Sequence, residues 1–418
     1  MRNVFVALGL AAFSIPGCTG ANAPDRSLMP ELRPAATGQG GAQVTRSRGF
    51  EQWVQGFRTR ALREGISAQT FDRAFRNVRF NDDIVARDRN QAEFVRPIWQ
   101  YLDGAVSAAR ISNGRAKLRE HAALLQRIEA RYGVPKEVVV AIWGLESSYG
   151  SMRGDTPIIE ALATLAHDGR RASFAENQLI AALRIIEAGD VSPETMRGSW
   201  AGAMGHTQFI PTSFLEYAVD FSGNGRRDIW SEDPTDALAS AAAYLARHNW
   251  TQGLPWGLEV QLPSGFDAGQ AGTRRSFGEW RALGVRAAPG TEMPAQGGGR
   301  LLFPAGVQGP ALLVTSNFDT IKRYNNADAY AIAIGHLSDR LRGGGPFVAS
   351  WPRNDRPLNS AEREELQRLL TARGYDTGGV DGRVGPMTVA AVRAYQGAAG
   401  MAPDGYVSMD LLERLRRR

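Results

Sequence analysis

The sequence predicts a mainly α (α+β) protein with a small β element and a separate three-helix module at its C-terminus. Three observations support this prediction. Apolar residues recur at spacings of three and four in the first half of the chain, as in Phe50, Trp53, Val54 and Phe57. In residues 256–315, apolar and polar residues alternate between Gly/Pro turns, which is typical of short strands. Beyond a Gly/Pro/Asn-rich stretch, helical periodicity returns and continues to the last residue.

Size and charge set the first limits on function. A chain of 418 residues exceeds one ordinary domain, and 43% hydrophobic with 22% charged residues is typical of globular proteins. The net charge of +6 favours anionic polymers such as nucleic acid, acidic lipid or a carboxylate-bearing cell wall. A genomic preference for arginine explains this charge equally well, since the one dense basic run is Arg416-Arg417-Arg418. We therefore expect no nucleic-acid partner.

The N-terminus predicts export. Residues 1–18 contain a short positive start, an apolar stretch too short to span a bilayer, and Ile15-Pro16-Gly17-Cys18, which resembles the lipobox of bacterial lipoproteins. Cys18, the single cysteine, is then the lipidation site and the mature N-terminus. Cleavage after Ala23, as in a plainly secreted protein, is a second option, but Pro24 would follow that bond and make it a poor protease substrate. A cytoplasmic protein with an apolar start is the third.

The residue after the lipobox-like stretch predicts which membrane holds the protein. Thr19 stands where an Asp commonly retains lipoproteins at the inner membrane. We therefore expect a periplasmic protein held by outer-membrane lipid through an N-terminal acyl anchor. Residues 19–48, rich in Gly, Ala, Pro, Thr and Arg, are expected to be a flexible tether.

Residues 49–342 are expected to form the main domain. Helical patterning begins at Gly49, and further helices are predicted at 91–109, 115–131, 136–148, 173–188 and 234–249. Strands are predicted around Leu258–Leu262, Leu301–Phe303 and Ala311–Thr315, followed by a helix at 319–342. A linker at 343–358 then leads to a module at 359–418, with helices at 360–373, 386–399 and 408–417 and with Asn359 or Ser360 as the first cap.

One carboxylate stands out as a chemical group. The segment from Lys136 to Gly150 is almost wholly apolar until Glu146, which shares a helical face with Val138 and Ile142. Burial at such a position raises the pKa of a carboxyl toward neutrality, as a general acid requires. A Glu on the solvent side of a buried helix is the plain alternative, and the helix pattern alone does not exclude it.

Three ordered motifs carry a resemblance that favours the first interpretation. Glu146-Ser-Ser-Tyr-Gly150, the segment from Ser199 to Pro211, and the segment from Arg323 to Tyr330 resemble the signatures of lytic murein transglycosylases of the membrane-bound B type. The resemblance covers roughly residues 49–340. It implies a lysozyme-like helical catalytic domain that cleaves the β-1,4 bond between N-acetylmuramic acid and N-acetylglucosamine in peptidoglycan glycan strands, during cell-wall turnover or remodelling. It also implies that no cofactor is needed for catalysis, and we expect a monomer.

The resemblance implies an intramolecular mechanism. Glu146 would protonate the glycosidic oxygen and then take the proton of the muramyl C6 hydroxyl, which closes onto the anomeric carbon to give a 1,6-anhydro end. Ordinary glycosidases use two carboxylates, and no second acid stands out in the motifs. A water-using muramidase, with Asp155 as its nearest second acid, and an inactive wall-binding lipoprotein remain as alternatives.

The motifs also suggest substrate-binding residues. Ser199, Gln208 and Asn325 are uncharged hydrogen-bonding residues suited to sugar hydroxyls and acetamides. Aromatic faces with a phenol can pack on sugar rings, and the candidates are Tyr244, Tyr324 and Tyr330. By the resemblance Tyr324, Asn325 and Tyr330 lie near Glu146, whereas core packing is an equally good explanation for Tyr244. Arg170 and Arg171 resemble a family pair that would meet peptide or lactyl carboxylates, with a solvated turn as the alternative.

The loop from Asp220 to Asp228 resembles the start of an EF-hand. Oxygen-bearing side chains at the first, third, fifth and ninth positions, with a glycine at the sixth, fit the pattern of a calcium loop. The candidate ligands are Asp220, Ser222, Asn224, the Arg226 position and Asp236. Ser231 replaces the usual last Glu, so a late carboxylate from Asp233 or Asp236 would have to complete the site. We expect weak calcium binding of structural role, and a polar turn without metal is the alternative.

Residues 359–418 resemble the small three-helix peptidoglycan-binding domain of many wall hydrolases. The resemblance rests on Leu366–Leu370, Gly374-Tyr375, Val380–Thr388 and Asp404–Val407. Two Asp-Gly turns separate the helices, and Pro386 suits a first helical turn. No cluster of His or Cys offers zinc ligands, so we expect the module to bind the wall without cutting it.

Overall fold

The computed structural model describes residues 39–89 and 96–417. Cys18 and residues 19–38 of the expected tether lie outside this range. The chain forms two compact units. The first contains the described part of Met1–Asn90 with Gly154–Met204 and Phe209–Leu215, and the second contains Gln91–Arg153, Gly205–Gln208 and Glu216–Arg418.

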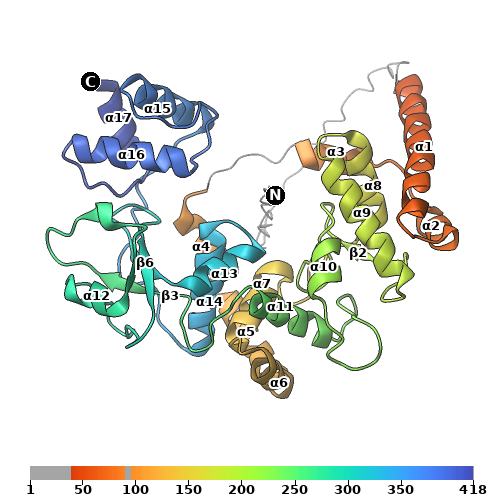
Figure 1. The fold of residues 1–418 in the computed structure, drawn as a ribbon, viewed down its shortest axis with the longest axis horizontal. Helices are drawn as coiled ribbons and strands as arrows, with labels where there is room; N and C mark the ends of the chain where they lie inside the picture. Colours follow the sequence, from red (N-terminus) through yellow and green to blue (C-terminus); the bar gives the residue numbers. More distant parts are fainter. Residues whose placement is uncertain (1–38, 90–95, 418) are drawn as a thin grey trace, which may run out of the picture. The chain divides into compact units, whose positions relative to one another are not determined.

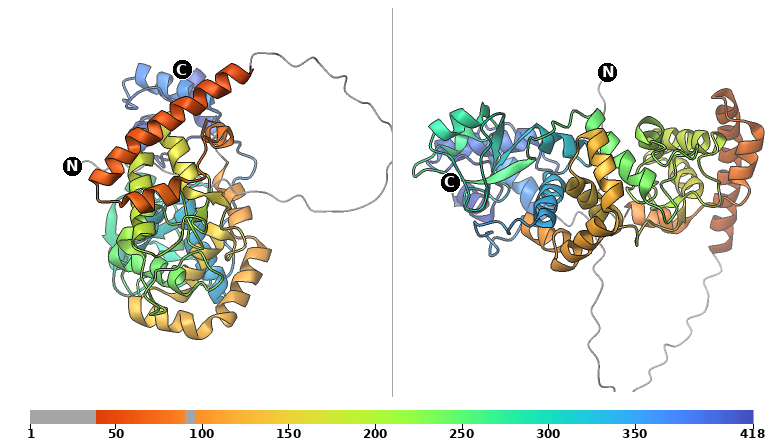
Figure 2. Two further views of the ribbon diagram at one scale, coloured as in Figure 1. Left: turned by 90° about the vertical axis from the view of Figure 1, so that its right-hand side faces the viewer. Right: turned by 90° about the horizontal axis from the view of Figure 1, so that it is seen from below.

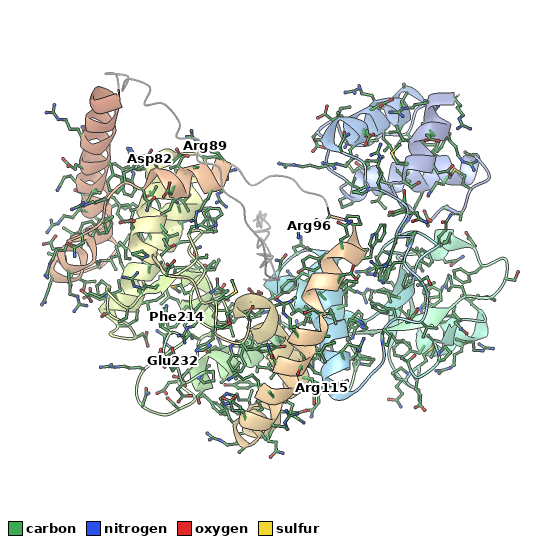
Figure 3. The ribbon with its side chains drawn as sticks, turned by 180° about the vertical axis from the view of Figure 1, so that it is seen from behind. Asp82, Arg89, Arg96, Arg115, Phe214 and Glu232 are labelled. Carbon is green, nitrogen blue, oxygen red and sulfur yellow. The ribbon has the colours of Figure 1, made fainter. Side chains whose placement is uncertain are left out.

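The first unit is a small helical assembly. Its elements are α1 (Gln39–Arg63), α2 (Ala68–Phe75), α3 (Asp82–Arg89), α8 (Ile158–Asp168), α9 (Ala172–Glu187), the start of α10 (Pro211–Tyr217), and the short antiparallel strands β1 (Thr156–Pro157) and β2 (Arg197–Gly198). The amphipathic helices α8 and α9 lie side by side, and Figure 2 shows α1 as one long rod. Figure 3 labels Asp82 and Arg89 at the two ends of α3, and Arg89 bonds Asp168 of α8 at 2.5 Å.

The helical part of the second unit surrounds α7. Its helices are α4 (Ile98–Ala105), α5 (Ala108–Glu120), α6 (Ala122–Tyr132), α7 (Lys136–Ser147), α11 (Thr235–Arg247), α13 (Ser316–Tyr324) and α14 (Asp328–Arg342). Ten of the twelve residues of α7 are buried, because α5, α6, α11 and α14 all pack on it. On α5, Arg115 (labelled in Figure 3) donates to the carbonyl oxygen of Arg340 on α14 at 2.6 Å. The apolar run of the sequence therefore becomes a central helix with almost no solvent-facing side.

The β element is a five-stranded antiparallel sheet in the order β4-β6-β7-β3-β5. Its strands are β3 (Gly257–Gln261), β4 (Arg274–Ser276), β5 (Arg286–Ala287), β6 (Gly298–Leu302) and β7 (Ala311–Val314), with the turn η1 (Ala268–Gln270) and α12 (Phe277–Ala282) between them. Leu313 pairs with Leu258 on one side and Leu301 on the other, and these leucines pack on Phe277 and Trp280.

The C-terminal module contains α15 (Ser360–Ala372), α16 (Pro386–Ala398) and α17 (Met409–Arg417) around a leucine-rich core, drawn in blue in Figure 1. Of the two candidate caps, Asn359 holds the position: its side chain accepts from the backbone N–H of Glu362 at 2.9 Å. The chain between α14 and α15 is held by the buried carboxylate of Glu259, which accepts from the backbone N–H groups of Val348 and Ala349 at 2.7 Å each.

The predicted mainly α (α+β) fold class is confirmed, but several helix limits are wrong. Helix α1 begins at Gln39 rather than Gly49, although this extension includes Gly40 and Gly41, which cost about 1 kcal/mol each in a helix. The helix predicted at 91–109 is α4, which begins after Pro97, and Ser107 then caps α5. The predictions at 115–131 and 319–342 each span two helices, which break at His121 and at 325–327. Within the described ranges, none of the helices combines the length and apolar character needed to span a bilayer.

Candidate active site

Glu146 lies in the last turn of α7 and is 6% exposed. Val138 and Ile142, on the same face, are buried, so Glu146 lies at the end of an apolar stripe. Burial penalises the charged form and raises the pKa of Glu146 to about 7. At neutral pH a large fraction of Glu146 is therefore protonated, which is the state that a general acid needs.

One tyrosine from another helix bonds this carboxyl group, and a second lies near enough to be affected by its charge. The hydroxyl of Tyr330, in the first turn of α14, donates to Oε1 of Glu146 at 2.6 Å. This bond favours the charged form and partly offsets the effect of burial on the pKa of Glu146. Burial, and then the nearby charge of Glu146, raises the pKa of Tyr101 on α4 to about 12. The causes that shift the pKa of Glu146 include no second carboxylate and no basic side chain.

The residues that follow Glu146 fix the end of α7. Ser147 donates from Oγ to the carbonyl oxygen of His206 at 2.6 Å and accepts from the N–H of Gly150 at 3.0 Å. Ser148 and Tyr149 both have positive φ, 48° and 61°, which is costly for residues with side chains. The turn places Tyr149 where its hydroxyl donates to the carbonyl oxygen of Arg110 at 2.7 Å.

His206 joins the second motif to the same helix. Its Nδ1 accepts from Trp143 Nε1 at 3.0 Å, and its Nε2 lies 2.7 Å from the carbonyl oxygen of Ser231. These partners require the neutral ring with the proton on Nε2. Burial lowers the pKa of His206 and favours the same state. A methyl group at Gly150 would lie 2.5 Å from Nδ1, which explains the glycine there.

Thr207 and Gln208 continue this segment beside Tyr324. The hydroxyl of Tyr324 donates to the carbonyl oxygen of Thr207 at 2.6 Å, and the nearby charge of Glu146 adds to burial in raising the pKa of Tyr324. Gln208, whose φ is 52°, donates from Nε2 to the carbonyl oxygens of Arg153 and Gly205 at 3.0 and 2.8 Å.

Tyr244 supports Tyr324 from α11. The two rings meet edge to face with centroids 5.0 Å apart, and the Tyr244 hydroxyl donates to the carbonyl oxygen of Arg323 at 2.6 Å. Tyr244 is 8% exposed, so packing explains most of its surface. Asn325 ends α13 in an extended conformation and is half-buried. The second unit therefore holds Glu146 and Tyr330 as one hydrogen-bonded pair and Tyr244 and Tyr324 as one aromatic pair, with Gln208 next to Thr207 and Asn325 next to Tyr324 in the chain.

The remaining sugar-binding candidates belong to the first unit. Arg170 donates to Oδ2 of the buried Asp88 at 2.6 Å, and Arg171 bonds Oδ1 of the same carboxylate. Burial of Asp88 acts to raise its pKa, but these two arginines outweigh it and lower the pKa. The pair is thus bound to an internal carboxylate, while Arg170 keeps about half of its side chain exposed (48%). Ser199 Oγ accepts from the N–H of Ala203 at 3.0 Å and closes a turn.

The acidic loop is organised around two carboxylates. Asp220 accepts from the N–H groups of Gly223 and Gly225 at 2.7 Å each, and Asp236 is buried and accepts from Ser222 N–H at 2.8 Å. The Ser222 hydroxyl lies 3.2 Å from Asp220 and 3.4 Å from Asp236. The carboxylate at the first position of the loop and the late carboxylate therefore approach the same hydroxyl group. The described part of the chain contains no group of three or more His, Cys, Asp or Glu placed to share a metal ion.

The sequence did not indicate three parts of the site. Tyr101 belongs to none of the motifs, and its role depends on how α4 packs. His206 and Thr207 lie inside the second motif, but a residue pattern does not specify their roles. His206 acts through its two ring nitrogens, and Thr207 acts through its backbone carbonyl oxygen. The unusual backbone at Gln208 gave no signal either, since the positive φ falls on a residue that rarely adopts it.

Comparisons with known proteins identify two domain families in the chain. The Transglycosylase SLT domain family matches residues 49–339, and the peptidoglycan-binding domain family matches residues 359–415. Membrane-bound lytic murein transglycosylase B of Escherichia coli is 34% identical over 251 residues, which are 58% of this chain and 66% of that protein.

Solved structures extend the likeness over most of the chain. SltB3 of Pseudomonas aeruginosa, in complex with NAG-anhNAM-pentapeptide, is 52% identical with a TM-score of 0.85, covering 88% of this chain and 99% of that one. Slt35 of E. coli in complex with calcium is 27% identical with a TM-score of 0.59, covering 74% and 98%. With its buried acid, tyrosine network and matched domains, the chain belongs to the SLT transglycosylase family and carries a C-terminal peptidoglycan-binding domain.

Proposed function

We propose that this protein is a lytic transglycosylase that cleaves the β-1,4 bond between N-acetylmuramic acid and N-acetylglucosamine in peptidoglycan and leaves 1,6-anhydromuramyl ends. The observation that supports this most directly is the buried carboxyl group of Glu146, with a pKa of about 7 and a phenol as its hydrogen-bond donor. The SltB3 structure with an anhydro-sugar muropeptide supports the product class.

The chemistry follows from the two protonation states of Glu146. In the neutral state its proton passes to the glycosidic oxygen as the bond to the anomeric carbon breaks. The resulting carboxylate then accepts the proton of the muramyl C6 hydroxyl, whose oxygen bonds to the anomeric carbon. The leaving chain carries the first proton, and Glu146 regains the second. No water is consumed, which suits an acid whose pKa is shifted by burial and by Tyr330 and not by a second carboxylate.

Tyr330 is suited to both steps. Its hydrogen bond to Oε1 stabilises the carboxylate formed after the first transfer, and fixes the carboxyl plane before it. The buried neutral phenol itself stays protonated, because burial and the charge of Glu146 raise its pKa well above its ordinary value.

We assign the sugar contacts to uncharged groups around this pair. Gln208 and Asn325 offer amides for hydroxyl and acetamide groups, and Tyr324 and Tyr244 offer aromatic surface. Ser199, Arg170 and Arg171 are proposed as further substrate contacts on the first unit. Arg170 is the better candidate of the two arginines for a peptide or lactyl carboxylate, since 48% of its side chain is exposed against 13% for Arg171.

The replacement Glu146→Gln tests the assignment. An amide keeps the shape but neither donates nor accepts the required proton, so cleavage of purified peptidoglycan should fall by about 10⁴ or more, the upper end for acid–base groups. Glu137→Gln is the matched control, because Glu137 lies on the same helix and is also buried, but pairs with Lys136 and Arg342 at 3.6 Å. Full activity of Glu146→Gln would remove this residue from the mechanism.

We further propose that the acidic loop binds calcium weakly and for stability alone. The oxygens of Asp220, Ser222, Asn224 and Asp236, with the carbonyl of Arg226, match the donor types that Ca²⁺ accepts. The convergence of Asp220 and Asp236 on the Ser222 hydroxyl supports this set. An asparagine in place of a third acid lowers the ligand charge, so the affinity should be low.

The N-terminal anchor is also proposed, on the lipobox-like sequence ending at Cys18. The membrane-bound name of the E. coli relative is consistent with a periplasmic enzyme at the outer membrane. Intact mass of detergent-extracted protein tests it. A diacylglycerol-modified, acylated Cys18 at the N-terminus is expected, and a mature N-terminus at Pro24 or an unprocessed Met1 would contradict it.

A further inference from the structure

The C-terminal module contains two turns of the same construction. In the first turn, Gln367 donates to Asp381 Oδ1 at 3.0 Å and accepts from the N–H of Gly382 at 2.8 Å. In the second turn, Gln396 donates to Asp404 Oδ1 at 2.7 Å and accepts from the N–H of Gly405 at 2.8 Å. Both glutamines are buried, and both glycines have the positive φ that the turn requires, 69° and 79°.

The two turns differ in what covers them. The second turn packs on the β element of the same unit: the N–H of Val307 donates to Asp404 Oδ2 at 3.0 Å, and a methyl group at Gly306 would lie 3.2 Å from the ring of Tyr406. Arg393, on α16, adds a bond to the carbonyl oxygen of Ala271 at 3.4 Å. This turn is therefore already used within the protein.

The first turn is uncovered and carries apolar side chains. Val380, Val384 and Met387 are 44%, 44% and 51% exposed, and they are three of the eight large hydrophobic side chains exposed in the described part of the chain. Single exposed apolar residues are ordinary, but three of them fall within these eight residues of a small module. We call residues 380–387 the outer turn.

The outer turn is rigid and carries a cation. Arg363, itself buried, donates to the carbonyl oxygen of Gly382 at 2.5 Å, and Gln367 donates to the carbonyl oxygen of Arg383 at 3.0 Å. Arg383 is exposed, and within the described residues its guanidinium donates no hydrogen bond, although the charge of Asp381 lies near it. A fixed backbone reduces the entropy lost when such a surface binds a ligand.

We infer that the outer turn, through Arg383, Val384 and Met387, binds the stem peptides of peptidoglycan rather than its glycan strands. A guanidinium recognises the carboxylates of those peptides, and the aliphatic side chains suit alanine methyl groups. Residues 376–387, all of them described, contain no aromatic side chain on which a sugar ring could stack. The inference rests on the proposed function only in taking peptidoglycan as the ligand.

The test measures binding of the full-length Glu146→Gln protein to insoluble sacculi, so that no wall is cleaved during the assay. Two variants are compared in this background, Arg383→Gln alone and Arg383→Gln with Val384→Ser and Met387→Ser. Leu283→Ser and Arg368→Gln are the matched controls: Leu283 is 44% exposed on the β element, and Arg368 is an exposed arginine on α15. Thermal melting of each variant shows whether the module stays folded.

We expect the triple variant to bind intact sacculi at least tenfold more weakly, the single variant to show part of this loss, and the controls to bind like the parent. On glycan strands stripped of stem peptides by an amidase, the parent should bind no better than the triple variant. Unchanged binding of the folded variants to intact sacculi would overturn the inference. A loss that is equal on stripped strands would overturn the choice of peptide over glycan. Neither result bears on the anhydro products, which a separate assay measures.

Discussion

The hydroxyl of Tyr330 donates a 2.6 Å hydrogen bond to Oε1 of Glu146, across the contact between α14 and α7. Burial and this hydrogen bond have opposite effects on the pKa of Glu146. Burial disfavours the carboxylate, while the phenol stabilises it, and the pKa of Glu146 settles at about 7. A carboxyl group at that pKa can lose and regain a proton at neutral pH with little cost in either direction.

The pH dependence of cleavage should report this balance. Because Glu146 must start protonated, kcat/KM should fall as the pH rises through about 7. Tyr330→Phe removes the donor that favours the carboxylate, so its alkaline limb should move to higher pH while the maximal rate drops about tenfold or more. Tyr324→Phe is the comparison, since that hydroxyl donates to the carbonyl oxygen of Thr207. A limb that stays in place in Tyr330→Phe would show that the bond does not set the pKa of Glu146.

Stability should depend on pH through the same residue. The pKa of Glu146 is raised from its ordinary 4.5 to about 7 in the folded protein, so the folded state holds this proton more tightly than the unfolded state. The stabilising contribution is complete below pH 4.5 and is lost as the pH rises through 7. Over this window the wild type should lose about 3 kcal/mol relative to Glu146→Gln, at about 1.4 kcal/mol per pKa unit. Urea unfolding of both proteins at pH 4.5 and pH 8 measures the difference, and parallel curves would contradict the shift.

His206 should be essential to the shape of the site. Replacing it by Phe leaves Trp143 Nε1 without an acceptor, whereas the Ser231 carbonyl oxygen still accepts from Arg153 at 2.9 Å. The free energy of unfolding should fall by about 1–3 kcal/mol, the cost of leaving one buried polar group unpaired. His206→Asn, whose side-chain oxygen can accept from Trp143, should recover part of both stability and cleavage rate. If Phe is tolerated as well as Asn, the ring nitrogens have no role.

The sequence located the candidate acid, but it did not indicate the contacts around it. Glu146 was identifiable because one acid ends an apolar helical run, and Tyr330 because it closes a motif. The contact between them joins positions far apart in the chain and depends on how α14 packs against α7. The break of the predicted 319–342 helix at 325–327 also depends on tertiary packing. It places Tyr324 at the end of α13 and Tyr330 at the start of α14. Tyr101 lies on a helix limited by Pro97 and Ser107, and only tertiary packing brings it near Glu146.

Calcium should raise the melting temperature without changing the rate of cleavage. A metal that binds only the folded loop shifts stability with its concentration. We expect a rise of a few degrees at millimolar Ca²⁺, a smaller rise with Mg²⁺, and no rise for Asp220→Asn with Asp236→Asn. Equal melting temperatures in Ca²⁺ and Mg²⁺ would leave the loop as a polar turn. A cleavage rate that followed calcium occupancy would contradict its purely structural role.

Mass analysis of the products from purified peptidoglycan tests the central claim most directly. If Glu146 acts first as acid and then as base toward the C6 hydroxyl, each new muramyl end is a 1,6-anhydro sugar, lighter by one water than a hydrolysed end. The same digest by Glu146→Gln should release almost no product, and Glu137→Gln should release the anhydro products of the wild type. Reducing muramic ends from the wild-type enzyme would mean that water attacks the anomeric carbon, and would contradict the mechanism.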